Sequence, residues 1–227
     1  MNLLIAYATT DGMTETISER LAASVRASGH DVKALDLRSA PATFTLSEFD
    51  AVLIGASVHA GGYQRSVKRF IHAHLPTLNA KASAFFSVCM AQASKHEDER
   101  AEGLQIAQQF VAGLGWRPLL VQPIAGALRF SRYGWLRSIV MRRIARKEQP
   151  GIDATRDHVY TDWSQVDLLL SSFLRSTISD RTIEIPKPRW RVPPSCKLVP
   201  ERQAGWEVEG DSRAIPEHGP AKGAWTH

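Results

Sequence analysis

A polar loop follows the first strand-like run of the sequence and opens the first predicted helix. A helix N-terminus presents unpaired N–H groups and the positive end of the helix dipole, which suits a bound phosphate. A glycine lets the backbone approach a ligand closely, and threonine hydroxyls can donate to phosphate oxygens. The loop therefore predicts a phosphate site; the alternative is a polar turn in which Asp11 or Thr14 caps the helix. Its residues are Thr9, Thr10, Asp11 (through its backbone N–H), Gly12, Met13 (through its backbone) and Thr14.

Two further loops, at 55–63 and 87–91, follow later strand-like runs. The carboxyl ends of parallel strands meet at one edge of a sheet, where ligands bind in open α/β folds. The small residues of these loops would let a flat ring lie against the backbone. The chain has no Gly-x-x-x-x-Gly-Lys and no Gly-x-Gly-x-x-Gly, so a nucleoside triphosphate and a Rossmann dinucleotide are disfavoured. FMN fits this set of loops best, with its ring against Ser57, Val58, His59, Gly61, Ser87, Val88 and Cys89.

Short apolar runs alternate with amphipathic segments along the first 180 residues, which is typical of βα units around a parallel sheet. The predicted strands are 3–8, 32–37, 51–56, 84–88 and 119–124. The predicted helices are 14–27, 63–75, 98–114 and one that follows Asp162, its cap. The pattern predicts an α/β fold, a doubly wound five-stranded parallel sheet, with residues 129–160 inserted before the last helix.

At these residues the chain resembles the flavodoxins, whose phosphate loop reads Thr/Ser-x-Thr-Gly-x-Thr. Asp11 stands where that pattern has its second threonine, so one hydroxyl donor is replaced by a carboxylate. The likeness is more specific to the short, flavodoxin-like, quinone-dependent protoporphyrinogen oxidases of bacteria, and it covers roughly residues 1–180. The matching segments are TDGMT at 10–14, AVLIGAS at 51–57, SAFFSV at 83–88, WRP at 116–118, IAGALRF at 124–130 and VYTDW at 159–163.

The resemblance implies oxidation of protoporphyrinogen IX to protoporphyrin IX in haem synthesis, with FMN as cofactor and a membrane quinone as electron acceptor. His59 is a candidate acid or base near the flavin, because an unperturbed imidazole titrates near neutrality; the alternative is a solvent-facing loop histidine. Tyr63 or Tyr133 could cover the flavin ring. Competing functions are an FMN-dependent NAD(P)H:quinone reductase, a flavodoxin-type electron carrier, and an interaction module that has lost FMN.

The insertion at 129–160 mixes arginines with aromatic and aliphatic residues, between residues 129 and 147 above all. Such mixtures suit an anionic membrane surface, and arginine can also hold the propionates of a porphyrinogen. We expect Arg129, Arg132 and Tyr133 to bind substrate; the alternative is a solvated helix packed on its own domain. We expect the domain to span 1–182, followed by a largely disordered Pro- and Trp-rich extension over 183–227.

Charge, cysteine content and hydropathy limit the partners, metal sites and cellular location that the sequence predicts. The net charge of +5 favours anionic partners, and we expect no nucleic acid among them. Cys89 and Cys196 form no disulfide framework or zinc knuckle, and His72 and His74 face different directions on a helix, so no metal site is predicted. Without a leader or an apolar run of about 18 residues, we expect a cytoplasmic protein, peripheral on the cytoplasmic face of the inner membrane. The oligomeric state is left open.

Overall fold

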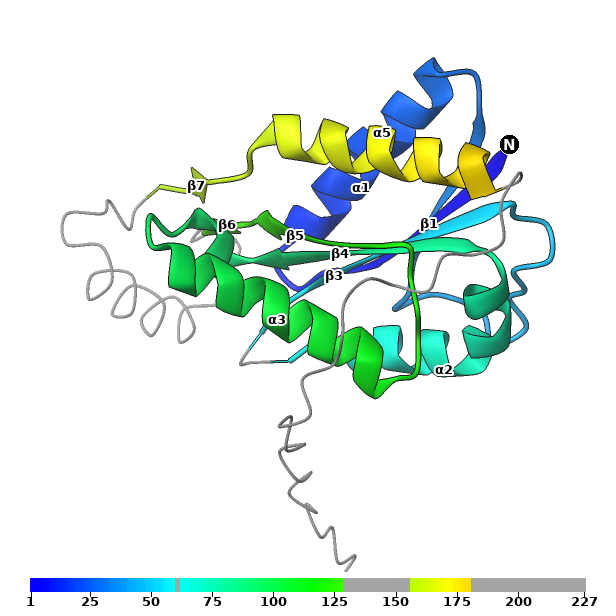
Figure 1. Ribbon diagram of the computed structural model, residues 1–227, viewed down its shortest axis with the longest axis horizontal. Helices are drawn as coiled ribbons and strands as arrows, with labels where there is room; N and C mark the ends of the chain where they lie inside the picture. The colour runs from blue at the N-terminus through cyan, green and yellow to red at the C-terminus, as the bar shows by residue number, and fades with distance from the viewer. Residues whose placement is uncertain (60–61, 129–155, 181–227) are drawn as a thin grey trace, which may run out of the picture. The chain divides into compact units, whose positions relative to one another are not determined.

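The computed structural model describes residues 1–59, 62–128 and 156–180, and within them five parallel strands form one sheet (Figure 1). The strand order is β2-β1-β3-β4-β5, so the chain steps outward from β1 in one direction and from β3 in the other. Ligands bind at the carboxyl edge of such sheets, where the order reverses. The strands are β1 (Asn2–Ala8), β2 (Asp31–Asp36), β3 (Ala51–Ser57), β4 (Ala82–Cys89) and β5 (Leu120–Ala125).

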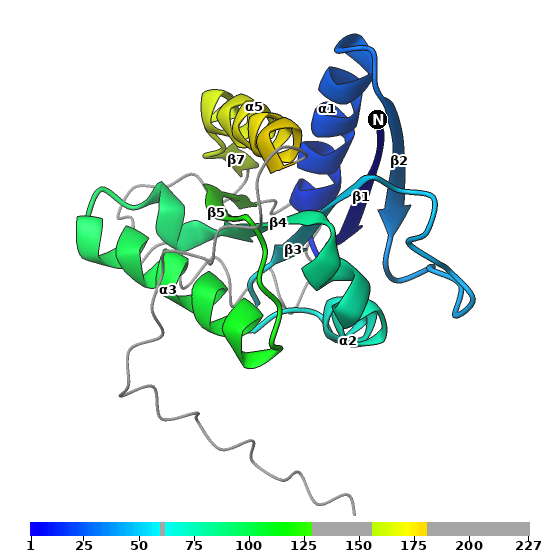
Figure 2. The ribbon, with the colours of Figure 1, turned by 45° about the vertical axis from the view of Figure 1, so that its right-hand side comes forward.

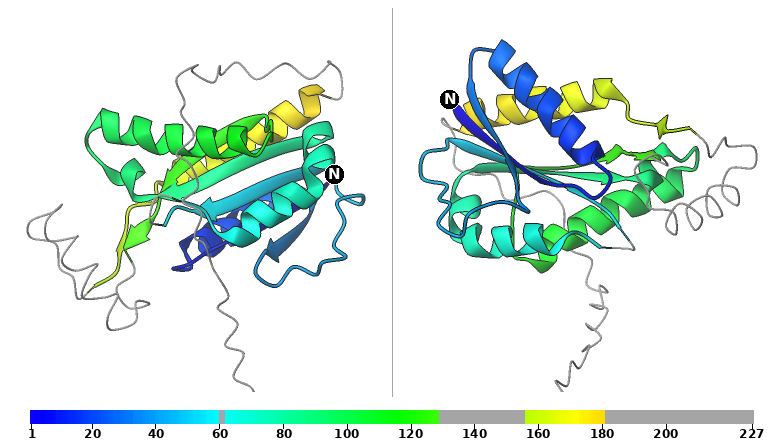
Figure 3. Two further views of the ribbon diagram at one scale, coloured as in Figure 1. Left: turned by 90° about the horizontal axis from the view of Figure 1, so that it is seen from below. Right: turned by 180° about the vertical axis from the view of Figure 1, so that it is seen from behind.

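Helices cover both faces of the sheet (Figure 2). Two of them, α1 (Met13–Ala27) and α5 (Trp163–Asp180), lie on one face. The other face carries α2 (Arg65–Ala80) and α3 (Glu97–Gly113). The view from behind in Figure 3 shows α1 lying along β1. Since both faces of the inner strands are covered, β1, β3 and β4 read as continuous apolar runs rather than alternating ones.

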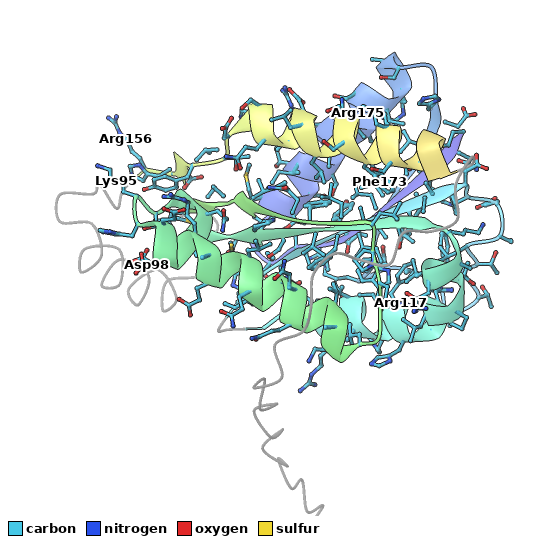
Figure 4. All side chains as sticks on the ribbon, viewed as in Figure 1. Lys95, Asp98, Arg117, Arg156, Phe173 and Arg175 are labelled. Atoms are coloured by element: carbon cyan, nitrogen blue, oxygen red, sulfur yellow. The ribbon has the colours of Figure 1, made fainter. Side chains whose placement is uncertain are left out.

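The core on the α1 and α5 side is built from side chains of both helices and of the sheet. Ile17 and Leu21 of α1 and Phe173 of α5 pack there against Phe86 of β4, and none of the four is more than 1% exposed. Figure 4 shows Phe173 pointing from α5 toward the sheet. Burying each such side chain stabilises the fold by about 1.5–3 kcal/mol.

The core on the opposite side is aromatic. Phe85 of β4 lies edge-on to Trp116, with ring centroids 5.8 Å apart, and also contacts Phe110 of α3. The buried indole of Trp116 donates to Ser83 Oγ at 3.0 Å, and Ser83 donates in turn to the carbonyl of Leu78 at 2.8 Å. The buried polar groups of Trp116 and Ser83 thus both have partners, as an apolar interior requires.

The predicted α/β fold is confirmed, and the predicted strands and helices agree with the observed ones except at the end of α2. That helix was expected to stop at residue 75, before Pro76, but it continues to Ala80. Proline removes one backbone donor, and the buried Leu78 one half-turn later holds the last part of the helix on the core. The sequence also gave no sign of the 3₁₀ helix η1 (Met90–Ala93).

A second, two-stranded antiparallel sheet joins β6 (Ala127–Leu128) to β7 (His158–Val159), and the sequence did not predict it. Residues 129–155 follow β6 and precede β7 in the chain and lie outside the described residues, as does the extension 183–227 with its predicted disorder. In the parts of the chain that the structure describes, no helix combines the length and apolarity needed to cross a bilayer.

Candidate functional site

The phosphate loop, residues 9–14, is held in shape by its own atoms. The backbone N–H of Gly12 donates to Thr9 Oγ1 at 2.8 Å, a buried bond. Gly12 is the N-cap of α1 with φ of +83°, a left-handed conformation that glycine adopts without strain. The N-cap position of α1 is occupied by Gly12, which has no side chain with which to cap the helix.

Thr14 supplies the observation that tests whether a phosphate fits this loop. Its side chain is completely buried, and its Oγ1 has no hydrogen-bond partner among the described residues. A buried hydroxyl without a partner costs about 1–3 kcal/mol, so such a group in a native loop calls for a partner that arrives separately. A phosphate oxygen is an acceptor of this kind. Met13, by contrast, turns its side chain into the core and can contribute only its backbone.

The second loop, residues 57–64, is tied to the phosphate loop by Gln64, which sequence reasoning missed. The Gln64 amide donates to Ser57 Oγ at 2.7 Å and to Thr10 Oγ1 at 3.1 Å, so it joins the carboxyl ends of β3 and β1. Gln64 is the N-cap of α2 but makes no side-chain cap bond. A long polar side chain placed just before a predicted helix, in a loop of small residues, was the signal that could have identified it.

A second tie between these loops runs from His59 to Asp11. His59 Nε2 lies 3.4 Å from Asp11 Oδ2, and the two side chains are 31% and 15% exposed. The backbone of His59 is fixed by two hydrogen bonds with Gly62, of 2.9 and 3.0 Å. The predicted acid or base thus stands beside the phosphate loop.

The third loop begins at the end of β4, and most of its predicted contacts face inward. Ser87 is fully buried and shares a hydrogen bond of 2.8 Å with the hydroxyl of Tyr63. Burial, opposed by hydrogen bonds from neighbouring groups, raises the pKa of the Cys89 thiol, so the protonated form is favoured. The carbonyl of Val88 accepts a bond of 2.9 Å from the N–H of Val58, which joins the second loop to the third. This bond brings Val58 and Val88 together at the carboxyl edge of the sheet.

Tyr63 is not placed to cover a flavin ring. Its side chain is 8% exposed and packs against Phe85 and Phe110, with ring centroids 5.3 and 4.3 Å away. Burial raises the pKa of Tyr63 to about 12, despite the opposing effect of the Ser87 hydrogen bond. The phenol is part of the core. The other candidate, Tyr133, lies outside the described residues, together with Gly61, Arg129 and Arg132.

The ends of the insertion are anchored beside the same edge of the sheet. Thr161 donates through its hydroxyl to the carbonyl of Ala125 at 2.7 Å, at the end of β5. The N–H of Tyr160 donates to the carbonyl of Gly126 at 3.1 Å. Arg156 and Lys95 lie at this end of the sheet (Figure 4). Segments far apart in the sequence thus meet where β4 and β5 end.

The loop at 9–14 offers hydroxyl groups that can donate hydrogen bonds to an anion. The loops after β3 and β4 offer backbone against which a flat group can lie. In the described ranges no three His, Cys, Asp or Glu side chains gather closely enough to hold a metal ion. The chemistry of the donor set therefore matches a phosphorylated organic ligand.

Comparisons with known proteins identify the family of the chain. The flavodoxin domain model matches residues 4–153. The protoporphyrinogen IX dehydrogenase (quinone) of Escherichia coli is 32% identical over 166 residues, which are 73% of this chain and 91% of that protein. The protein of the same name from Leishmania major is 32% identical over 176 residues, 75% of this chain and 73% of that protein. Among solved structures, oxidised flavodoxin 2 from Bacillus cereus is 18% identical, with a TM-score of 0.45, over 78% of this chain and 99% of that one. The chain therefore belongs to the flavodoxin domain family and, within it, to the flavodoxin-like protoporphyrinogen IX dehydrogenases.

Proposed function

We propose that this protein oxidises protoporphyrinogen IX to protoporphyrin IX in haem synthesis and passes the electrons to a membrane quinone. It is an oxidoreductase whose cofactor is FMN. The observation that carries the proposal is the likeness to protoporphyrinogen IX dehydrogenase over 91% of the Escherichia coli protein, at 32% identity. The flavodoxin domain match, over residues 4–153, includes the three loops at the carboxyl edge of the sheet, where ligands bind in such folds.

The phosphate loop holds the phosphate of FMN in this proposal. Thr14 Oγ1 donates to a phosphate oxygen and thereby gains the partner that it lacks among the described residues. The hydroxyls of Thr9 and Thr10 and the N-terminus of α1 complete the cradle, since a helix N-terminus favours an anion. The N–H of Gly12 is already used by Thr9. Gly12 therefore contributes its conformation rather than a donor.

The ring end of the cofactor lies between the second and third loops. The proposed contacts of the ring are Ser57, Val58, His59, Gly61, Ser87, Val88 and Cys89. Of these, Val58 and Val88 are joined by a backbone hydrogen bond. When bound, FMN supplies a hydride acceptor, which no side chain of the protein can provide. The contribution of these loops is orientation, because they hold the flat group at the sheet edge with backbone contacts and exclude water with buried side chains. The assignment of His59 as an acid or base at this end stays a prediction.

The insertion at 129–160 is the proposed binding region for both the substrate and the membrane surface. Arg129, Arg132 and Tyr133 are the proposed contacts of the porphyrinogen, with the arginines on its carboxylates. The same basic-aromatic segment is proposed to rest on the anionic cytoplasmic face of the inner membrane, within reach of the quinone. The net charge of +5 supports this placement. Both proposals are consistent with the anchoring of Tyr160 and Thr161 beside the end of β5.

Anaerobic steady-state turnover tests the function. The FMN-loaded protein, protoporphyrinogen IX and a soluble quinone are mixed, and porphyrin fluorescence is followed. We expect porphyrin formation that requires both protein and quinone. In a parallel reaction NAD(P)H replaces the porphyrinogen. Quinone reduction by NAD(P)H without porphyrin formation in the first reaction would contradict the proposal and establish the NAD(P)H:quinone reductase instead.

A further inference from the structure

A carboxylate stands in a loop that is built for a phosphate. Asp11 lies between Thr10 and Gly12, and its side chain is only 15% exposed. The repulsion between like charges grows as water is excluded from around them. A phosphate bound at the start of α1 would therefore be repelled by the Asp11 carboxylate. A positive charge close to this residue reduces that repulsion.

His59 is placed to provide that charge. Its Nε2 lies 3.4 Å from Asp11 Oδ2, so an imidazolium there forms an ion pair with the carboxylate. The pair is formally neutral, whereas Asp11 by itself carries a full negative charge. Two negative groups beside an imidazole, the carboxylate and a bound phosphate, both favour its charged form.

The contact does not depend on a flexible arrangement of the two loops. The backbone of His59 is held by its pair of bonds with Gly62. Gln64 joins the same two loops a second time, through Ser57 and Thr10. The position of His59 relative to Asp11 is therefore set by several bonds of the chain, as expected for a preformed site.

We propose that His59 acts at the phosphate end of the cofactor, where it neutralises Asp11 so that the loop can accept a phosphate dianion. This inference rests on the proposed binding of FMN. His59 then has a binding role in place of proton transfer at the ring. This role also explains how the loop tolerates Asp11 at the position where flavodoxins have a threonine, because His59 neutralises the carboxylate. The effect of losing His59 is then specific to the phosphate.

A comparison of FMN with riboflavin isolates the phosphate, because the two ligands differ only in that group. Binding to the apoprotein is measured by the change of flavin fluorescence, with no turnover involved. The variants are His59→Gln, His59→Arg and the double variant Asp11→Asn/His59→Gln. His72→Gln is the matched control, because His72 is an exposed histidine on α2. Circular dichroism and thermal unfolding verify that each variant is folded.

We expect His59→Gln to weaken FMN binding by about tenfold or more, the size of one modest charge interaction, and to change riboflavin binding by less than about twofold. His59→Arg, which keeps the charge, should bind FMN like the wild type. The double variant should recover most of the lost affinity, because the carboxylate that required neutralisation is gone. His72→Gln should bind both flavins normally.

Equal losses of FMN and riboflavin affinity in His59→Gln would overturn the inference and place His59 at the ring. A double variant as weak as His59→Gln alone would overturn it too, because Asp11 would then not be the reason for the loss. Wild-type protein that binds riboflavin but gains nothing from the phosphate would also contradict it, while leaving a flavin site in place. Wild-type protein that binds neither flavin would overturn the FMN site itself and this assignment with it.

Discussion

The backbone N–H of Gly12 donates to the hydroxyl of Thr9 at 2.8 Å, across the turn that leads into α1. This bond is buried and closes the phosphate loop with the chain's own atoms. A preformed loop loses less conformational entropy when a ligand binds, so the ligand binds more tightly. We therefore expect Thr9 to affect ligand binding mainly through the shape of the loop.

Replacing Thr9 by valine keeps the shape of the side chain but removes the acceptor. We expect the unfolding free energy of the apoprotein to fall by about 1–2 kcal/mol, because the N–H of Gly12 is left buried without a partner. FMN affinity should fall as well, by about fivefold or more. Thr9→Ser keeps the hydroxyl and should show neither loss. Chemical denaturation and FMN titration measure the two quantities; a Thr9→Val protein as stable as wild type would contradict the role of the bond.

Thr14→Val should act in opposite directions on stability and on binding. The buried hydroxyl of Thr14 has no partner among the described residues, so its removal should leave the apoprotein equally stable or stabilise it by about 1 kcal/mol. FMN binding should weaken by about tenfold, because a donor to the phosphate is lost. Thermal unfolding with and without FMN gives both numbers. A variant that loses stability and keeps its FMN affinity would show that the hydroxyl serves the fold instead.

Gly55→Ala should damage the core below the site. A Cβ at position 55 would lie 2.0 Å from Cζ of Phe86, on the adjacent strand β4, which is far closer than atoms can pack. Overpacking of this kind costs about 1–3 kcal/mol or more, and we expect that loss in chemical denaturation. Gly113→Ala is the matched control, since a Cβ there meets nothing within 4 Å and alanine is the better helix former. The combination of Gly55→Ala with Phe86→Leu should recover part of the stability; no recovery would mean that another contact causes the strain.

Tyr63 should titrate abnormally late. Its pKa rises from 10.0 to about 12, chiefly because burial disfavours the phenolate. A folded-state pKa above the unfolded one means that this stabilisation is fully present below about pH 10 and is lost as the pH rises toward 12. Wild-type stability should therefore fall more steeply over this interval than that of Tyr63→Phe. The absorbance difference between the two proteins should titrate near pH 12; a difference that titrates near pH 10 would show that the phenol is accessible.

The fold could be predicted because its signals are local and redundant. Strands β1, β3 and β4 are buried on both faces, so each is a continuous apolar run that periodicity identifies. The pairing of β6 with β7 could not be foreseen, because it joins residues about 30 apart through only two residue pairs. The end of α2 was missed for another reason, since burial of Leu78 outweighs the local effect of Pro76.

Contacts among the candidate site residues could not be predicted from the sequence. The position of residues 9–14 between a strand and a helix follows from the sequence pattern alone, but the inward turn of Tyr63 and Ser87 depends on how β4 packs. The bridge made by Gln64 depends on where α2 begins relative to β1. The approach of His59 to Asp11 joins two loops nearly 50 residues apart. Tertiary packing sets such contacts, and neither residue type nor spacing reveals them.

Whether this flavodoxin-like chain uses FMN to oxidise protoporphyrinogen IX can be measured in one half-reaction without a quinone. The FMN-loaded protein is mixed anaerobically with protoporphyrinogen IX in a stopped-flow instrument, and flavin absorbance and porphyrin fluorescence are recorded together. The account predicts that the flavin bleaches as porphyrin appears and that added quinone restores the flavin colour. A flavin that stays oxidised in the presence of excess porphyrinogen would contradict it.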